Sequence, residues 1–305
     1  MKEFKVLGGT DHEKDKGRDA LRREYEKNSF AFDGENTKSP QEIKYIDNAN
    51  NYLSQEMSRL GVNGFEEIKP GQVHFLDEEA WDNRFPGDLS QGCDILGGVC
   101  INNEDVRKES EENGVNFELK RFIVMLHELV HFQGCQKFVN VGDTTYSYRH
   151  GYLAYNANGE EYHFKMFDEA IVDTVTGLVA SNHASDIKRD FGINLEEWDE
   201  LKKYLNYRGS IALVSHIVVK VAESEGCENA LVWDEMMRNH FTGNMMFLRK
   251  IEKAYGTKAL RLLSMIDFKK QQTKEEDEKQ NRLRRYFLDE TTDEEREIIT
   301  RELLK

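Results

Sequence analysis

The sequence predicts an α+β fold in which a small, mostly antiparallel sheet precedes a helical lobe. Two short apolar runs, residues 71–76 and 98–102, have the turn-bounded pattern of strands. Between residues 117 and 138, apolar side chains recur at three- and four-residue steps, the pattern of a helix with a broad buried face. From residue 210 to 268 the helical pattern continues, interrupted by glycines, so the second half of the chain is expected to be mainly helical.

The composition indicates a chain with a buried core and an acidic balance of charge. Its 305 residues carry a formal charge of −15, and the length suits one large or two small domains. The excess of acidic residues and the absence of a basic stripe argue against nucleic acid as a partner. No apolar run approaches the length of a membrane span or forms a secretory signal at the start. We therefore expect a cytoplasmic protein with no membrane partner, whose cysteines are reduced thiols: Cys93, Cys100, Cys135 and Cys227.

Three regions are expected along the chain. Residues 1–40 are polar and contain several helix breakers, which predicts a loosely packed arm with no more than a short helix. Residues 41–268 are expected to form the main domain, with the sheet and central helix in 41–140 and a hairpin with further helices in 141–268. Residues 269–305 are rich in Lys, Glu and Gln, and we predict a charged helical extension that packs lightly or contacts a partner.

The central helix contains the sequence His127-Glu128-Leu129-Val130-His131. Side chains four positions apart lie on one helix face, so His127 and His131 can offer two imidazole nitrogens to one tetrahedral zinc. Glu128 lies at the edge of that face, where it can reach a water on the open position of the metal. Two zinc ligands and a general base form the HExxH motif. The alternative is an amphipathic helix with two histidines at its border, but the apolar residues on both sides favour the zinc site.

A third zinc ligand is expected from a second helix that begins near residue 167. There Glu169 and Asp173 lie four residues apart on one face, among apolar residues. Such a pair is usually a solvated face, but here it follows an HExxH motif without a third histidine, because position 137 is lysine. We predict that Glu169 binds zinc and that Asp173 accepts a hydrogen bond from a ligand histidine. Asp168 points about 100° around the helix from Glu169, so we expect it to be dispensable for zinc binding.

The sequence HELVH followed by FDEAIVD resembles the gluzincins, the zinc peptidases typified by thermolysin and the aminopeptidase-N-like enzymes. The resemblance covers roughly residues 95–265 and implies a zincin-like catalytic domain with an edge strand, an HExxH helix and a helical lobe. The gap from His131 to Glu169 is longer than is usual in either group, and a tyrosine-rich hairpin predicted at residues 146–167 occupies it. By position, the resemblance implies His127, His131 and Glu169 as ligands of one Zn²⁺ per chain, Glu128 as general base and Asp173 as support for a ligand histidine.

The strand before the zinc helix is the expected substrate-binding edge. In zinc peptidases such a strand pairs with an extended peptide, and here it contains Gly98, Val99 and Cys100. An ordinary hairpin strand explains the same pattern equally well. In aminopeptidases the edge strand carries a G-x-M-E-N motif whose glutamate holds the free amine of the substrate, but this sequence has cysteine where that glutamate is expected. An endopeptidase or oligopeptidase is therefore favoured over an aminopeptidase.

A tyrosine is the expected donor to the oxyanion of the reaction. The segment Tyr207-Arg208-Gly209 is similar to the Y-[KR]-G segment of the aminopeptidase-N-like enzymes. The resemblance implies that the hydroxyl of Tyr207 stabilises the negative charge of the tetrahedral intermediate. Rival donors are available in the same half of the chain: Tyr155, Tyr162, His163 and Tyr204.

The leading hypothesis is zinc-dependent hydrolysis of peptide bonds, with a peptide or protein as the substrate. A first alternative is a deformylase-like amide hydrolase, which takes a cysteine ligand from an upstream G-C motif such as Gly92-Cys93. A cysteine ligand would leave Glu169 and Asp173 without a role. A second alternative is a non-catalytic, peptidase-like binding module, and the presence of Glu128 counts against it because a structural metal site needs no general base.

Overall fold

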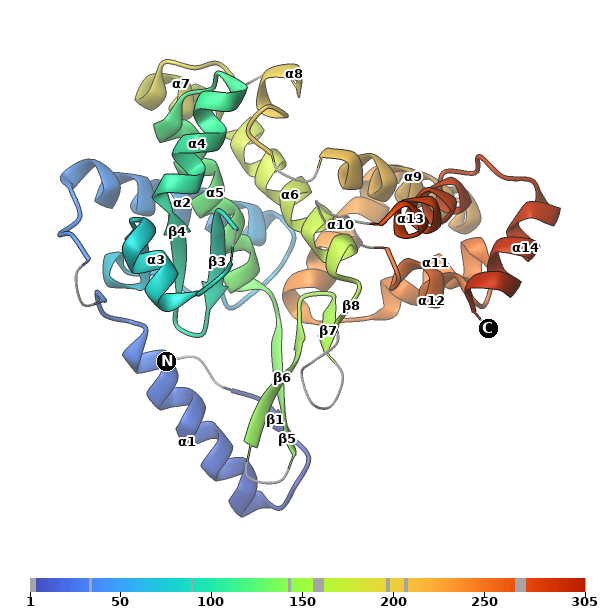
Figure 1. The fold of residues 1–305 in the computed structure, drawn as a ribbon, viewed down its shortest axis with the longest axis horizontal. Helices are drawn as coiled ribbons and strands as arrows, with labels where there is room; N and C mark the ends of the chain where they lie inside the picture. Colours follow the sequence, from blue (N-terminus) through green and yellow to red (C-terminus); the bar gives the residue numbers. More distant parts are fainter. Residues whose placement is uncertain are drawn as a thin grey trace.

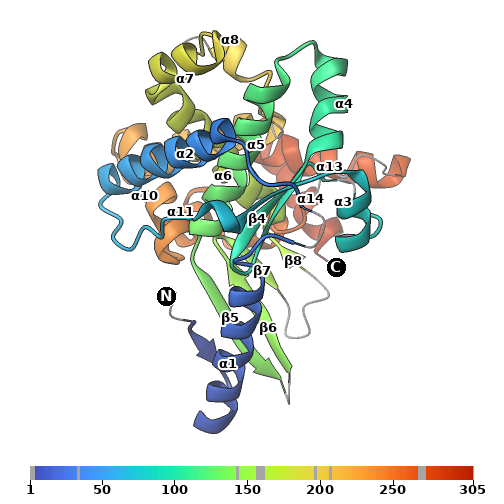
Figure 2. The ribbon, with the colours of Figure 1, turned by 90° about the vertical axis from the view of Figure 1, so that its left-hand side faces the viewer.

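The chain forms a mainly helical α+β body with two small sheets, from which a narrow arm projects (Figures 1 and 2). The computed structural model describes residues 4–32, 35–88, 90–141, 144–155, 162–195, 198–205, 208–266 and 273–304. Among the helices in these ranges, none combines the length and the apolar character needed to cross a bilayer.

The helices and strands follow one another along the whole described chain. The strands are β1 (Val6–Leu7), β2 (Val73–Leu76), β3 (Gly92–Ile95), β4 (Gly98–Asn102), β5 (Gln136–Val141), β6 (Thr144–His150), β7 (Leu153–Tyr155) and β8 (Tyr162–His163). The first helices are α1 (Asp11–Lys27), α2 (Pro40–Arg59), a 3₁₀ turn (Pro70–Gln72), α3 (Glu78–Arg84), α4 (Asn103–Asn113), α5 (Phe117–Gln133), α6 (Lys165–Asn182) and α7 (Ala184–Phe191). The remaining helices are α8 (Trp198–Leu201), α9 (Arg208–Glu225), α10 (Asn229–Thr242), α11 (Met246–Tyr255), α12 (Ala259–Leu263), α13 (Lys274–Phe287) and α14 (Asp293–Leu303).

Helix α5 lies in the middle of the main core. One side of it packs on β3 and β4, and the other packs on α6, which in turn contacts α9. The helix begins at Asn116, whose side-chain oxygen accepts a hydrogen bond of 2.9 Å from the Leu119 amide. It ends at Gly134, a glycine that the sequence places where the helix should stop, and the chain then extends into β5. The predicted central helix is therefore present and buried, as its wide apolar face requires.

Strand β4 is the middle strand of its sheet, and the predicted exposed edge at this strand is wrong. It pairs in parallel with β2 and antiparallel with β3, and Gly98, Val99 and Cys100 are all buried. A continuous apolar run is typical of a strand that is covered on both faces, which explains this position. The strand that is paired on one side only and contacts α5 is β3, a strand that was not predicted.

The five-stranded sheet has the order β1-β5-β6-β7-β8. The predicted hairpin is present where β7 pairs antiparallel with β8, with Ala154 opposite His163, and its turn lies outside the described residues. Strand β5 was not predicted, and it forms a longer hairpin with β6. Strand β6 leads from the arm toward β7 and the start of α6 (Figure 1).

The N-terminal region is ordered, and the expected loosely packed arm is wrong for its described part. Strand β1 pairs in parallel with β5, placing Val6 opposite Phe138. Helix α1 begins with a capping box in which Thr10 and Glu13 satisfy each other's backbone amides. A small buried apolar cluster packs inside this arm: Phe4, Val6, Leu21 and Phe138. The region is polar in sequence because helix α1 buries only one narrow face.

The C-terminal region is helical as predicted, but it packs closely instead of lightly. Leu283 and Phe287 of α13 are fully buried against the core that contains α9 and α11. The Tyr255 hydroxyl donates a hydrogen bond of 2.9 Å to the Phe287 carbonyl, and the Tyr286 hydroxyl donates one of 3.1 Å to the Tyr255 carbonyl. The two last helices therefore complete the helical lobe (Figure 1).

This packing predicts that Phe287→Ala destabilises the whole protein. Removing a fully buried phenylalanine side chain is expected to lower the free energy of unfolding by about 3–5 kcal/mol. The matched control is Leu231→Ala, since Leu231 is 61% exposed and its loss should change the free energy by less than about 0.5 kcal/mol. Both are measured by urea denaturation, and equal stability of the two variants would contradict the close packing of α13.

Candidate metal centre

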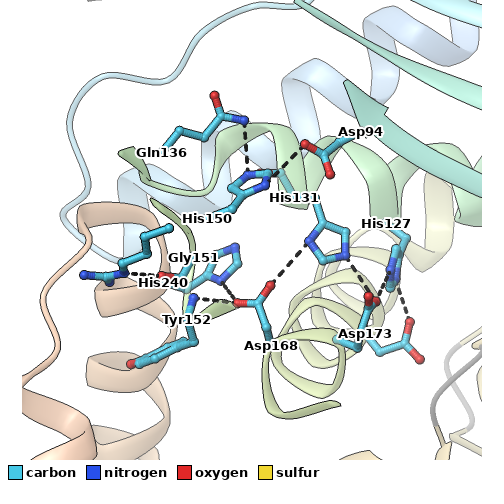
Figure 3. A network of polar contacts seen from close by, with 12 residues as sticks. Asp94, His127, His131, Gln136, His150, Gly151, Tyr152, Asp168, Asp173 and His240 are labelled. Carbon is cyan, nitrogen blue, oxygen red and sulfur yellow. Dashed lines mark hydrogen bonds and ion pairs between the residues drawn. The ribbon is translucent and has the colours of Figure 1, made fainter. Parts of the chain in front are cut away.

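Three side chains converge where α5 and α6 pack together, and Figure 3 shows the two from α5, His127 and His131. His127 and His131 lie one turn apart on α5, and Glu169 lies in the second turn of α6. One ligand atom from each of these residues lies within 4.8 Å of the other two. The structure thus brings together the three residues that the sequence predicts as metal ligands.

The separations of the Glu169 carboxylate from the two imidazoles suit zinc. The Glu169 Oε2 atom lies 3.3 Å from His127 Nε2 and 3.2 Å from His131 Nε2. A tetrahedral zinc ion with bonds of about 2.1 Å separates its ligand atoms by about 3.4 Å. Two imidazoles, one carboxylate and an open fourth position form a donor set that catalytic zinc sites use. The residues present therefore fit a zinc ion with little rearrangement.

Without metal, the same three groups form a buried ion-pair network. Burial acts to lower the pKa of His131, but the charge and hydrogen bond of Glu169 outweigh it and raise that pKa to about 9. Burial also opposes the charged form of His127, yet Asp173 and Glu169 together hold its pKa well above the usual value. Burial raises the pKa of Glu169, and the two histidines more than reverse this, so its carboxyl is held ionised.

Asp173 contacts the first ligand histidine, as the sequence predicts. Its Oδ1 atom accepts a hydrogen bond of 2.7 Å from His127 Nδ1, and the aspartate is buried. With Nδ1 protonated and held in this way, the Nε2 atom of His127 is left to face Glu169 and a metal. The spacing of four residues between Glu169 and Asp173 thus provides a ligand and its support on one helix face.

Asp168 supports the second ligand histidine, which the sequence argument missed. Its Oδ2 atom lies 3.5 Å from His131 Nδ1, and its side chain is buried. The expectation that Asp168 is dispensable assumed that only Glu169 could face the histidines. In fact the two neighbours on α6 approach His131 from different sides, Glu169 through Nε2 and Asp168 through Nδ1. Figure 3 shows the contact with Asp168. Each ligand histidine therefore has its own carboxylate partner.

Asp168 is itself held by two groups from outside α6 (Figure 3). Its Oδ1 atom accepts a hydrogen bond of 2.7 Å from the Tyr152 amide and lies 3.1 Å from His240 Nδ1. Burial raises the pKa of Asp168, but His240, His131 and the Tyr152 amide lower it more, so its carboxyl stays ionised. His240 is fully buried on α10, and no local sequence pattern links it to the HExxH motif.

Glu128 lies beside the ligands, against the edge strand β3. A Cβ atom at Gly92 would come within 2.9 Å of both Cγ and Oε1 of Glu128, so a glycine is needed there for this close contact. Burial raises the pKa of Glu128 to about 7, although the charges of His127 and His131 oppose the shift. A carboxyl group with this pKa can both accept and release a proton near neutral pH.

A cavity of about 430 Å³ opens onto the three ligands and Glu128. One wall comes from β3 and the residues before it, and another comes from β7 and the first turn of α6. Besides His127, Glu128, His131 and Glu169, the lining residues are Asp88, Ser90, Gln91, Gly92, Cys93, Asp94, Glu109, His150, Leu153, Tyr155 and Lys165. The site is therefore accessible from outside and large enough for a short stretch of peptide.

His150 is a further imidazole in this cavity, at the end of β6. Its Nδ1 atom lies 3.3 Å from Asp94 Oδ2, and its Nε2 atom lies 2.5 Å from the carbonyl oxygen of His131. This contact joins β6 and β3 to the last turn of α5 (Figure 3). His150 was not among the predicted site residues, because it lies within a strand with no recognisable metal or catalytic spacing.

The predicted oxyanion donors that the structure describes lie in different places relative to the cavity. Tyr207 lies outside the described residues, so its role stays a prediction. Of the rivals, Tyr155 lines the cavity, whereas Tyr204 is buried and does not line it, and His163 is exposed on β8. The side chain of Tyr162 is also outside the described part of the structure.

Cys93 lines the cavity but is not part of the metal cluster. It faces Cys100 across β3 and β4, and its thiol hydrogen bonds to that residue. This hydrogen bond, and then burial, raises the pKa of the Cys93 thiol far above its usual range. A zinc ligand must be a thiolate, so this environment disfavours Cys93 as a ligand.

No protein-family model, curated protein or solved structure matches this chain. The arrangement of the site residues is therefore the basis for any functional assignment.

We predict that the two supporting aspartates each strengthen zinc binding. Asp173→Asn and Asp168→Asn should each weaken zinc affinity by about tenfold to a hundredfold without abolishing it, because each leaves a ligand histidine less firmly oriented. Zinc affinity is measured by competition with a chelator, with Asp47→Asn on the exposed face of α2 as the control. Unchanged affinity in Asp168→Asn would show that its contact with His131 is not used.

We also predict that zinc affinity rises with pH up to about 9. Zinc binds neutral imidazole, and in the metal-free protein the pKa of His131 is about 9, so below this pH zinc must displace a proton. Each displaced proton weakens zinc binding by about tenfold per pH unit below the pKa. The same chelator competition, repeated from pH 6 to pH 10, checks this. Affinity that stops rising near the ordinary histidine pKa of 6.5 would contradict the raised value.

Proposed function

We propose that this protein is a zinc-dependent peptidase of the gluzincin type. The observation that supports it most is the convergence of His127 Nε2, His131 Nε2 and Glu169 Oε2 beside the buried carboxyl of Glu128, at the base of an open cavity. A purely structural metal site would need neither the open cavity nor a carboxyl with a raised pKa next to the ligands.

His127, His131 and Glu169 would hold the zinc ion, with Asp173 and Asp168 fixing the two imidazole rings. Zinc in such a site supplies Lewis acidity, which polarises the peptide carbonyl and lowers the pKa of water. Glu128 then takes the proton of the attacking water and passes it to the leaving nitrogen, a task suited to a carboxyl group with a pKa of about 7.

Strand β3 is the proposed substrate edge, in place of β4. It is paired on one side by β4, and Gly92, Cys93 and Asp94 line the same cavity as the ligands. An extended peptide can add to such an edge through main-chain hydrogen bonds. This arrangement of edge strand, HExxH helix and ligand-bearing helix is why we propose a zincin-like fold for the catalytic part of the chain.

The deciding experiment separates metal binding from turnover. Purified protein loaded with zinc should contain about one zinc ion per chain and should cleave members of a mixed peptide library, followed by mass spectrometry. Glu128→Gln should keep the zinc and lower the cleavage rate by at least about a thousandfold, because it keeps the shape of the side chain but removes the base.

Glu169→Ala is the complementary variant, and it should lose zinc and cleavage together. If the zinc-loaded wild type cleaves no peptide, or if Glu128→Gln cleaves as fast as the wild type, the peptidase proposal is wrong. Full zinc content in Glu169→Ala would contradict the ligand assignment alone.

A further inference from the structure

Lys165 lines the same cavity as the candidate metal ligands. It is the first residue of α6 and lies one turn before Glu169 and two turns before Asp173, so all three share the helix face that carries the metal site. Its half-buried side chain lines the cavity together with the predicted ligands. Among the described residues that line this cavity, it is the single lysine or arginine.

Three carboxylates on the opposite side of the cavity have contacts of their own. Asp94 lies 3.3 Å from His150, and Glu109 lies 3.5 Å from Lys120. The Asp88 carboxylate accepts a hydrogen bond from the Ser90 amide. These three acids come from the β3 and α4 side of the cavity, whereas Lys165 comes from the α6 side. The β3 and α4 side of the cavity thus contributes three acids, and the α6 side contributes Lys165 together with Glu169.

The separation of Lys165 from Glu169 along α6 can be compared with distances along a bound peptide. Four residues of helix span about 6 Å, and one residue of an extended peptide spans about 3.3 Å. The flexible stem of a lysine lets its ammonium group reach back along the helix toward the ligands. The ammonium group can therefore approach a substrate group that lies one residue beyond the carbonyl under attack.

We propose that Lys165 selects substrates with a carboxylate on the residue that follows the scissile bond. This inference rests on the proposed peptidase function and adds the substrate class to it. The carboxylate can be the free C-terminus of a single leaving residue or the side chain of Asp or Glu within a longer peptide. In both cases a charge-assisted hydrogen bond to the ammonium group would position the substrate within an otherwise acidic cavity.

The kinetic test uses the library peptide that is cleaved best, in four versions. The first pair is a longer peptide with an amidated C-terminus, in which the residue after the scissile bond is either Asp or Asn. The second pair is a shorter peptide in which the residue after the scissile bond is the last one, and its C-terminus is either a free acid or an amide. The wild type should prefer the acid in at least one pair by about tenfold to a hundredfold, mainly through KM. The pair that shows the preference identifies the source of the carboxylate.

In Lys165→Met this preference should disappear with the zinc content unchanged, and Lys165→Arg should keep most of it. Lys188→Met, at an exposed position on α7, is the control and should behave like the wild type. No acid preference in the wild type, or an equal loss of activity on acids and amides in Lys165→Met, would overturn the proposal.

A binding measurement tests Lys165 independently of turnover. Glutaric acid monohydroxamate and its amide differ only in the carboxylate, and the hydroxamate group of each binds zinc. Calorimetry on the zinc-loaded wild type should show about tenfold tighter binding of the acid, and Lys165→Met should bind both equally. If the wild type cleaves no peptide, the peptidase proposal fails while this pair still decides the role of Lys165. Equal affinity of the wild type for both compounds contradicts that role.

Discussion

The site depends on one oxygen atom, Glu169 Oε2, which lies within 3.3 Å of both imidazoles of α5. This shared contact requires α5 and α6 to pack in a fixed axial register, because sliding one helix by one turn would separate the carboxylate from both histidines. Buried apolar residues such as Leu126, Val130 and Val172 maintain that register. The core of the protein and its candidate metal centre are therefore set by the same helix pair.

The charges around this oxygen are arranged in two layers. The inner layer is the pair of histidines with Glu169, and the outer layer is Asp173 and Asp168, which hold the far sides of the two rings. His240 extends the outer layer into α10, so a helix distant in sequence helps to orient His131 through Asp168. Because buried charges are costly unless paired, each layer stabilises the ionised form of the next.

The sequence was most informative where chemistry and periodicity coincide. The HExxH spacing and the Glu169–Asp173 spacing lie within single helices, so the residues that share a face could be predicted directly. The contact of Asp168 with His131 was missed because the side from which they meet depends on how α5 and α6 cross, and periodicity contains no such information. The edge strand was predicted at β4 but is β3 for a similar reason, since strand order is a property of the whole sheet and cannot be read from one strand. His150 and His240 could not be predicted, because only tertiary packing brings them near the site.

The parallel pairing of β1 with β5 has a consequence for the order of events during synthesis. Val6 can find its partner only after Phe138 has left the ribosome, and His127 and His131 precede Glu169 along the chain. A nascent chain therefore exposes both histidines before the carboxylate that joins them exists. The complete cluster of His127, His131 and Glu169 can form only once α6 has been made and has docked, so the assembly of this cluster comes late in the maturation of the protein.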